Sequence, residues 1–304
     1  MLNPSFARGR PAPGPPRADA ANARPRHRER EGVAALSTIL ITGAAGGVGT
    51  LMRPRLARAG RTLRLLDIAA LDPAAGPGEE AVQASVTDLD AMIEACRGAD
   101  AVIHLGGISG ERPWQEILEV NIQGTYAVFE AARRAGVPRV VFASSNHTVG
   151  FYSPEAYPLP EAIVPLPDTY YGVSKVTGEA LGALYAYRYG LDVISIRILT
   201  CFDQPRDLRG LSTWFAPDDC AQLLEACLAA EKPGYRVVYG VSANTRGGWV
   251  SLDGARALGF EPSGDAEQFA AELIAQHGDP DPTDPVLRHL GGKFTLSDLD
   301  ADEL

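Results

Sequence analysis

Short apolar runs alternate along this chain with longer segments in which apolar residues return at helical spacing. The runs have the length of strands, and most end at a glycine, a small polar residue or an acid. Because strands buried on both faces of a parallel sheet are nearly continuous in apolar residues, the runs predict the strands of such a sheet. They lie at residues 38–42, 62–67, 81–84, 101–105, 139–145 and 193–198.

The segments between these runs predict the helices that connect the strands. Gly60, Gly136 and Gly190 each follow such a segment, and glycine readily takes the left-handed conformation that ends a helix. The predicted helices cover residues 47–59, 87–96, 114–135 and 170–189. Together the strands and helices predict an α/β fold with a Rossmann-like, doubly wound parallel sheet.

The regular alternation loosens after Thr200. A helix that begins at a proline is predicted over 217–230 and a strand over 236–239, followed by short helices near 251–258 and 265–276. We therefore predict a dinucleotide-binding Rossmann core at residues 37–200. Residues 201–304 are predicted to form a small C-terminal region that covers the substrate and returns some segments to the core.

Residues 1–36 differ in composition from the rest of the chain. They carry seven arginines against three acids, and the prolines of residues 8–17 exclude a packed helix or strand. This composition favours a disordered basic extension, or sequence upstream of the true start. A basic arm or a targeting peptide is the alternative, although the apolar stretch of a secretory signal is missing.

The overall composition limits the classes of partner. Its hydrophobic fraction of 45% is ordinary for a globular protein, and its formal net charge of −10 argues against a nucleic-acid-binding surface. No apolar run approaches the ~18 residues that a membrane span needs. No spacing of His, Cys and Asp suggests a metal site. The cysteines form no CxxC pair, so we expect them to be reduced thiols in a cytoplasmic protein. They are Cys96, Cys201, Cys220 and Cys227.

A glycine-rich turn follows the first predicted strand. Gly43, Gly46 and Gly49 stand at three-residue spacing where the first helix begins, and an acid, Asp67, ends the second strand. Such glycines let the backbone approach a pyrophosphate at the helix N-terminus, and the acid can accept hydrogen bonds from a ribose. An acid there repels a 2′-phosphate, which favours NAD over NADP. Glycine-rich turns without a ligand and ordinary strand-end acids are the alternatives.

A tyrosine and a lysine stand four residues apart in the predicted helix 170–189. Tyr171 and Lys175 therefore share one helix face, where the ammonium would lower the pKa of the phenol and make it a base. A surface tyrosine beside a lysine is the alternative. Only three of the 28 basic residues are lysines, however, which indicates a particular use for this ammonium.

Polar residues follow the strand 139–145, at the sheet edge where α/β proteins bind ligands. Ser145 can hydrogen-bond a reacting oxygen, although loop capping is an alternative. We interpret His147 as a hydrogen-bonding partner of the substrate, because no pattern indicates a nucleophilic triad. His104 lies in an apolar strand and is predicted to be a core histidine. Asn121 can bond a main-chain carbonyl near the site, or lie on a helix surface.

These motifs together resemble the extended short-chain dehydrogenase/reductase superfamily and, within it, the bacterial uronate dehydrogenases. The resemblance covers about residues 39–294. Two of its blocks, VFASSNHT at 141–148 and LSTWF at 211–215, are more specific than the superfamily motifs. The others are GAAG at 43–46, HLGGIS at 104–109, YGVSK at 171–175 and SAN at 242–244.

The resemblance implies NAD-dependent oxidation of D-galacturonate or D-glucuronate at C1 to an aldaric acid lactone. It implies that Tyr171 is the base, that Lys175 lowers its pKa and holds the nicotinamide ribose, and that Ser145 fixes the C1 oxygen. The implied cofactor contacts are Gly43, Gly46, Gly47, Val48, Gly49, Asp67, Ser85, Val86, Leu105 and Lys175. The implied substrate contacts are Ser109, Ser145, Asn146, His147, Tyr171, Thr200 and Arg209. A homo-oligomer is implied by analogy.

Arginine has an independent argument as the carboxylate anchor. An anionic sugar needs a fixed cation, and the guanidinium fork fits a carboxylate with two parallel hydrogen bonds. Arg206 and Arg209 are both candidates, with a solvated surface loop as the alternative. Two departures from the family stand out: Ala84 and Ser85 replace the acid commonly found near the adenine, and residue 200 is Thr where Ser is expected.

Two other functions share the superfamily motifs. The first is an epimerase or dehydratase that acts on a nucleotide sugar, but the C-terminal region is short for that substrate. Dehydratases also require an acidic residue beside the catalytic serine, and this chain has Asn146 at that position. The second is a non-catalytic NAD-sensing protein. Such proteins often lose the tyrosine or the lysine, and this chain has both, Tyr171 and Lys175.

Overall fold

The computed structural model describes residues 37–281 and 283–299, and the extension predicted for residues 1–36 lies outside them. Seven parallel strands form one sheet in the order β3-β2-β1-β4-β5-β6-β7. The order reverses between β1 and β4, which opens a crevice there at the carboxyl ends of the strands. The strands are β1 Thr38–Thr42, β2 Thr62–Asp67, β3 Glu79–Gln83, β4 Ala101–His104, β5 Arg139–Ser145, β6 Asp192–Ile198 and β7 Tyr235–Gly240.

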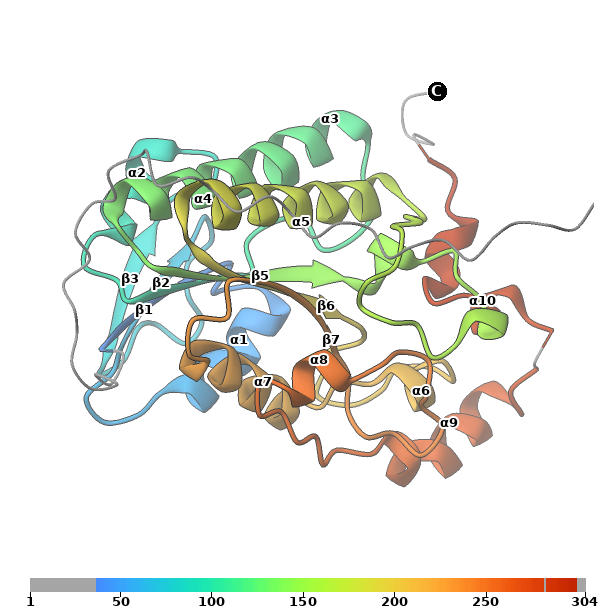
Figure 1. Cartoon of the computed structure of the whole chain (residues 1–304). Coiled ribbons are helices and arrows are strands. Elements are labelled where there is room, and N and C mark those ends of the chain that lie inside the picture. Colours follow the sequence, from blue (N-terminus) through green and yellow to red (C-terminus); the bar gives the residue numbers. More distant parts are fainter. Residues whose placement is uncertain (1–36, 282, 300–304) are drawn as a thin grey trace, which may run out of the picture. The chain divides into compact units, whose positions relative to one another are not determined.

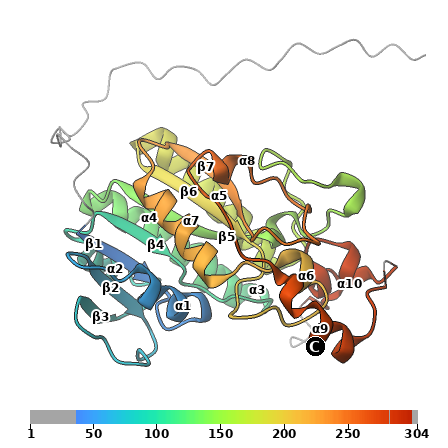
Figure 2. The same cartoon turned by 90° about the horizontal axis from the view of Figure 1, so that it is seen from below.

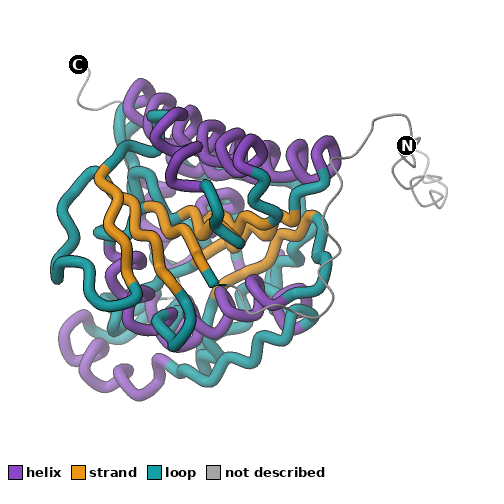
Figure 3. The backbone as a smooth tube through the Cα atoms, turned by 90° about the vertical axis from the view of Figure 1, so that its left-hand side faces the viewer, coloured by secondary structure: helices purple, strands orange, loops and turns teal. Residues whose placement is uncertain are grey.

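Helices cover both faces of the sheet (Figure 1; Figure 3). On one face α2, α4 and α5 pack on the sheet through Met92, Phe129 and Tyr185. On the other face α1 and α7 pack through Met52 and Leu223. The predicted doubly wound α/β fold is therefore confirmed. These helices are α1 Gly47–Leu56, α2 Leu89–Cys96, α4 Gly124–Ala135, α5 Tyr170–Tyr189 and α7 Pro217–Ala229.

Two predicted helices differ from the structure. Helix α1 ends at Leu56 rather than at 59, since Ala57 has extended backbone and Pro54 removes one helical hydrogen bond near this end. The predicted helix 114–135 begins as α3 Trp114–Glu116, continues as one π-helical segment, η1 Ile117–Gln123, and ends in α4. A π-helical segment inside a helix often marks a functional site, and this one carries Asn121.

The residues after 200 contribute to two parts of the structure. Strand β7 and helix α7 complete the sheet and its helical layer, while short helices gather beyond the carboxyl ends of the strands (Figure 2). The domain boundary at residue 200 stays a prediction. The short helices are α6 Gly210–Thr213, α8 Asp253–Arg256, η4 Ala266–Phe269, α9 Ala270–His277, α10 Pro285–Arg288 and η5 Gly292–Leu296; two further 3-10 turns are η2 Asn146–Val149 and η3 Pro154–Ala156.

The four cysteines are buried and free. Among the residues that the structure describes, no helix has the length and apolar character to span a membrane.

Candidate active site

A cleft of about 890 Å³ opens at the carboxyl ends of β1, β4, β5 and β6. Every residue that the sequence analysis assigned to a cofactor or a substrate lines it, so the fold brings all of them to one place. They are Gly43, Gly46, Gly47, Val48, Gly49, Asp67, Ser85, Val86, Leu105, Ser109, Ser145, Asn146, His147, Tyr171, Lys175, Thr200 and Arg209.

Two glycines of the turn after β1 leave no room for a side chain. Gly43 has a φ of +71°, and a Cβ on it would lie 2.6 Å from the backbone nitrogen of Gly106. A Cβ on Gly49 would lie 2.3 Å from the carbonyl oxygen of Gly43. Glycine at these positions therefore lets the turn, the loop after β4 and the start of α1 pack closely, and the turn lines the cleft where a helix N-terminus can bind a diphosphate.

Asp67 is held at the end of β2 by the backbone around it. Its Oδ2 accepts a hydrogen bond from the N–H of Ala45 and its Oδ1 one from the N–H of Ala69, both at 2.9 Å. Each carboxylate oxygen keeps a further lone pair for a ribose hydroxyl. With the glycine turn, this arrangement fits a dinucleotide with a free 2′-hydroxyl.

Ser85 and Val86 line the far end of the cleft. The hydroxyl of Ser85 pairs with the hydroxyl of Thr87 at 2.8 Å and accepts a hydrogen bond from the Thr87 N–H at 3.2 Å. Its hydroxyl is thus already engaged within the loop. The side chain of Val86 is nearly buried and packs toward Gly106.

Helix α5 begins with two side-chain caps that fix Tyr171. Thr169 accepts a hydrogen bond from the N–H of Gly172 at 3.1 Å. Glu111 accepts hydrogen bonds from the N–H groups of Tyr170 at 3.2 Å and Tyr171 at 2.9 Å. Carboxylates stabilise helix N-termini. Sequence reasoning missed Glu111, because it lies about sixty positions before the helix that it caps.

Burial dominates the electrostatics of the Tyr171 and Lys175 pair. It raises the pKa of Tyr171 to about 12, against the lowering effect of a hydrogen bond with Ser145. It lowers the pKa of Lys175 to about 8. The Lys175 ammonium donates to the carbonyl oxygen of Ala143 at 2.9 Å and lies 5.4 Å from the centre of the Tyr171 ring. In the protein alone, burial and then the charge of Asp168 raise the pKa of the phenol, and the lowering by Lys175 that the sequence indicates stays a prediction.

The prediction for His104 is confirmed. It is buried between the hydroxyls of Thr42, at 2.8 Å, and Thr125, at 3.2 Å. Burial and then the charge of Lys175 lower the pKa of His104 to about 3. The ring is a neutral core group beneath the cleft.

Ser145 at the end of β5 shows one of its two predicted alternatives, loop capping, while its contact with a reacting oxygen stays a prediction. Ser145 caps the 3-10 turn η2 by accepting a hydrogen bond from the N–H of His147 at 3.2 Å, so the loop-capping reading holds. The same hydroxyl donates to Oδ1 of Asn146 at 3.5 Å. The Asn146 amide donates to the carbonyl oxygen of Leu290 at 2.8 Å, which ties the C-terminal segment to the cleft.

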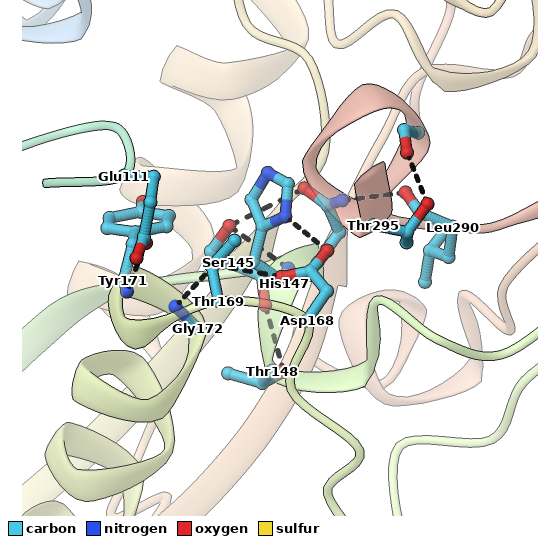
Figure 4. A network of polar contacts seen from close by, with 12 residues as sticks. Glu111, Ser145, His147, Thr148, Asp168, Thr169, Tyr171, Gly172, Leu290 and Thr295 are labelled. Atoms are coloured by element: carbon cyan, nitrogen blue, oxygen red, sulfur yellow. Dashed lines mark hydrogen bonds and ion pairs between the residues drawn. The ribbon is translucent and has the colours of Figure 1, made fainter. Parts of the chain in front are cut away.

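His147 has a partner that sequence reasoning missed. Its Nδ1 lies 2.7 Å from Oδ2 of Asp168, a buried carboxylate just before α5 (Figure 4). The ring packs against Phe294 of the C-terminal segment, with 4.2 Å between the ring centres. Twenty-one positions separate the histidine from the aspartate, so local spacing gave no signal.

Asn121 holds the loop that carries Ser109. It accepts a hydrogen bond from the N–H of Ile108 at 2.8 Å and donates to the carbonyl of the same residue at 3.0 Å. It also donates to Ser174 at 3.2 Å, whose hydroxyl donates to the Tyr171 carbonyl at 2.6 Å. The predicted bond from Asn121 to a main-chain carbonyl is confirmed, and Asn121 is buried rather than on the helix surface.

The structure separates the two candidate arginines. Both line the cleft, but Arg206 is exposed, with its guanidinium 3.5 Å from the centre of the Phe202 ring. Arg209 reaches into the cleft, where it donates to the Thr200 hydroxyl at 3.2 Å and to the carbonyl oxygen of Leu290. Burial lowers its pKa. A solvated surface position is therefore wrong for Arg209.

The Arg209 guanidinium has spare hydrogen-bonding capacity. Its buried Nε has no hydrogen-bond partner, and among residues 37–281 and 283–299 no carboxylate forms an ion pair with it. Asp207 and Asp168 raise the pKa of Arg209 through their charges alone, and a half-buried guanidinium with no carboxylate at ion-pair distance among the described residues marks a place for an anion. Within the same residues, no group of three or more His, Cys, Asp or Glu side chains is placed to hold a metal ion.

Comparisons with known proteins agree with this geometry. A model of the NAD dependent epimerase/dehydratase family matches residues 39–212. The chain is 44% identical over 260 residues to a uronate dehydrogenase of Pseudomonas putida. The aligned residues cover 85% of this chain and 96% of that protein. A structure of an Agrobacterium tumefaciens uronate dehydrogenase mutant complexed with NAD is 43% identical, with a TM-score of 0.82 and coverage of 87% and 99%. For a glucuronic acid dehydrogenase of Chromohalobacter salexigens, the identity is 42%, the TM-score 0.83 and the coverage 88% and 99%.

Proposed function

This chain belongs to the uronate dehydrogenases of the NAD dependent epimerase/dehydratase family, and on that premise we propose that it oxidises D-galacturonate or D-glucuronate at C1. The hydride leaves C1, the proton leaves the C1 hydroxyl, and the ring form becomes an aldaric acid lactone that later hydrolyses. One observation supports this substrate class above the others. The cleft that holds Tyr171 and Lys175 also holds Arg209, a half-buried guanidinium without a counterion among the described residues.

The cofactor end of the cleft suits NAD. Gly43, Gly46 and Gly49 line the cleft at the N-terminus of α1, where a diphosphate can bind, and Asp67 presents lone pairs to the adenosine ribose. A 2′-phosphate would meet the Asp67 carboxylate and be repelled, which favours NAD over NADP. When bound, NAD in its oxidised form accepts the hydride and brings a positively charged ring into the cleft.

We assign the removal of the C1 hydroxyl proton to Tyr171. The base must be a phenolate, and burial alone opposes that form. The ammonium of Lys175 favours it, and its charge acts strongly in a site from which substrate excludes water. Ser145 donates to the C1 oxygen, and Glu111 and Thr169 keep the phenol in place through the first turn of α5.

We assign the binding of the carboxylate, at the other end of the sugar, to Arg209. Its fork can form two parallel hydrogen bonds with the C6 carboxylate, which replaces the missing counterion. Ser109, Asn146, His147 and Thr200 surround the remaining hydroxyls. A neutral hexose would leave the guanidinium without its anion, so we expect discrimination against glucose and galactose.

The test is the formation of NADH by the purified protein with NAD and galacturonate, glucuronate, galactose or glucose, followed by its absorbance. The expected result is a rise with both uronates and a much smaller one with the neutral sugars. NAD binding without turnover of any of the four would refute the proposal. Nucleotide sugars would then test the epimerase or dehydratase alternative, and no turnover at all would favour a sensor. The cytoplasmic location and the homo-oligomer stay predictions.

A further inference from the structure

Asp168 is a fully enclosed carboxylate that lies behind His147, a residue of the cleft lining. Its side chain has no exposed surface. Its Oδ2 faces Nδ1 of His147 at 2.7 Å, and its Oδ1 accepts a hydrogen bond from the Thr169 hydroxyl at 3.0 Å. No arginine or lysine forms an ion pair with it within the part of the chain that the structure describes. Among the described residues, the basic side chain that contacts this carboxylate is therefore the imidazole of His147.

Two glycines make the position of this carboxylate possible. A Cβ on Gly150 would lie 2.0 Å from Asp168 Oδ2, and a Cβ on Gly291 would lie 1.8 Å from the same atom. The two glycines are joined by a backbone hydrogen bond of 2.9 Å from Gly291 to Gly150. The backbone of two segments thus packs directly on the carboxylate, which has no room to turn away from the histidine.

This contact determines which nitrogen of His147 carries the hydrogen. An ionised carboxylate only accepts hydrogen bonds, so Nδ1 must donate. In the neutral ring Nε2 then carries a lone pair, on the side of the ring away from Asp168 (Figure 4). The ring itself is fixed between Phe294, at 4.2 Å, and Tyr171, at 5.6 Å between ring centres. His147 lines the cleft, and Nε2 is the ring nitrogen that Asp168 leaves available.

We propose that Asp168 is a positioning residue, which acts through His147 by holding Nε2 as a hydrogen-bond acceptor for a hydroxyl group of the sugar. This inference rests on the proposed function. A guanidinium only donates, so Arg209 takes the carboxylate of the sugar and does not bind a hydroxyl hydrogen. A bare Nε2 only accepts, so it takes a hydroxyl and disfavours the carboxylate. The two opposite preferences orient the substrate with its carboxylate at Arg209 and C1 at Tyr171.

The first experiment observes the ring nitrogens directly. Protein labelled with ¹⁵N at its five histidines is compared by NMR with the variants Asp168→Asn and His147→Asn, the second of which assigns the signals. The wild type is expected to show hydrogen on Nδ1 and a bare Nε2 for His147. In Asp168→Asn this preference is lost, because an amide can donate to Nδ1 or accept from it.

A matched control separates this effect from loss of any buried carboxylate. Asp219 is also buried and accepts hydrogen bonds from Ser242 at 2.5 Å and Gly264 at 2.9 Å. Asp219→Asn therefore removes a buried charge that has no histidine partner. It is expected to leave the His147 signals unchanged. Equal nitrogen signals in the wild type and in Asp168→Asn would overturn the inference.

The second experiment asks whether Asp168 acts through His147 during turnover. For the loss of one oriented hydrogen bond we expect Asp168→Asn to raise KM for uronate about tenfold and to change kcat less. In a His147→Ala background the same substitution is expected to add little further. Effects that multiply in the double variant would show a separate structural role and overturn the inference.

Failure of this inference is distinguishable from failure of the proposed function. The nitrogen signals are measured without substrate or turnover. If no uronate is oxidised and the signals still respond to Asp168→Asn, the positioning of His147 stands and the proposed substrate falls. If uronate is oxidised and the signals do not respond, the inference about Asp168 falls alone.

Discussion

Replacement of Arg209 by methionine should weaken substrate binding without weakening the fold. The two protein groups that accept hydrogen bonds from Arg209 each have another donor. The Leu290 carbonyl also accepts from Asn146 at 2.8 Å, and the Thr200 hydroxyl pairs with the Thr213 hydroxyl at 2.9 Å. Methionine has a similar length and no charge, so it leaves neither group unpaired.

The size of the effect follows from the charge that Arg209 offers. Loss of one partner of a buried, hydrogen-bonded charge pair costs about 2–5 kcal/mol. At about 3 kcal/mol, KM for glucuronate should rise on the order of 10²-fold. Glucose, which has no carboxylate, should show little change. In the protein without substrate the buried guanidinium has no counterion to lose, so the melting temperature should stay equal or rise.

Initial rates of NADH formation on glucuronate and glucose, together with thermal melting of the same samples, test both halves of this prediction. Arg206→Met is the matched control. Arg206 is exposed and rests on Phe202, so its loss should raise KM much less. A KM for glucuronate close to the wild type, or equal losses on glucuronate and glucose, would refute the carboxylate role. A clear fall in the melting temperature would refute the argument on stability.

Three further predictions concern the base, the buried histidine and the glycines beside Asp168. Tyr171→Phe should reduce kcat by about 10²–10⁴-fold while NAD binding, measured by fluorescence, persists; near-normal turnover would exclude Tyr171 as the base. Burial holds the folded pKa of His104 near 3, below its ordinary 6.5, so the unfolded chain binds more protons and stability is lost as pH falls below about 6.5. Urea midpoints between these pH values should therefore depend less on pH in His104→Gln than in the wild type, and equal slopes would contradict this. Gly291→Ala should lower the melting temperature and raise KM, because its methyl group would overlap Asp168; Gly110→Ala, where a Cβ meets nothing within 4 Å, should do neither.

The sequence was sufficient for the sheet and for most of the cleft. A parallel sheet buries its strands on both faces, so each strand appeared as an apolar run, and glycines marked the ends of the main helices. The residues at the carboxyl ends of such strands meet at one edge by topology alone. That is why Gly43, Asp67 and Ser145 could be placed together from the sequence, while Tyr171 was added by its spacing from Lys175 and by the family resemblance.

Contacts between distant segments were beyond that reasoning. Glu111 caps the helix of Tyr171, and Asp168 holds His147, yet neither pair has a periodic or local spacing. The same holds for Leu290, whose carbonyl joins Asn146 and Arg209. The effect of burial on Tyr171 was also missed, since the i+4 lysine is visible in a sequence and desolvation is not.

An acidic chain that binds an acidic sugar must rely on its cleft alone. The formal net charge of −10 opposes the approach of an anion, but salt screens charges beyond about 8 Å under physiological conditions. Inside the cleft the half-buried Arg209 guanidinium is partly shielded from solvent, where its attraction for a carboxylate is stronger than at the surface. The direction of hydrogen bonds then orients the sugar, which charge alone does not do, because Arg209 donates and His147, held by Asp168, accepts. We therefore expect selectivity for the uronate to reside in these three residues rather than in the field of the whole protein.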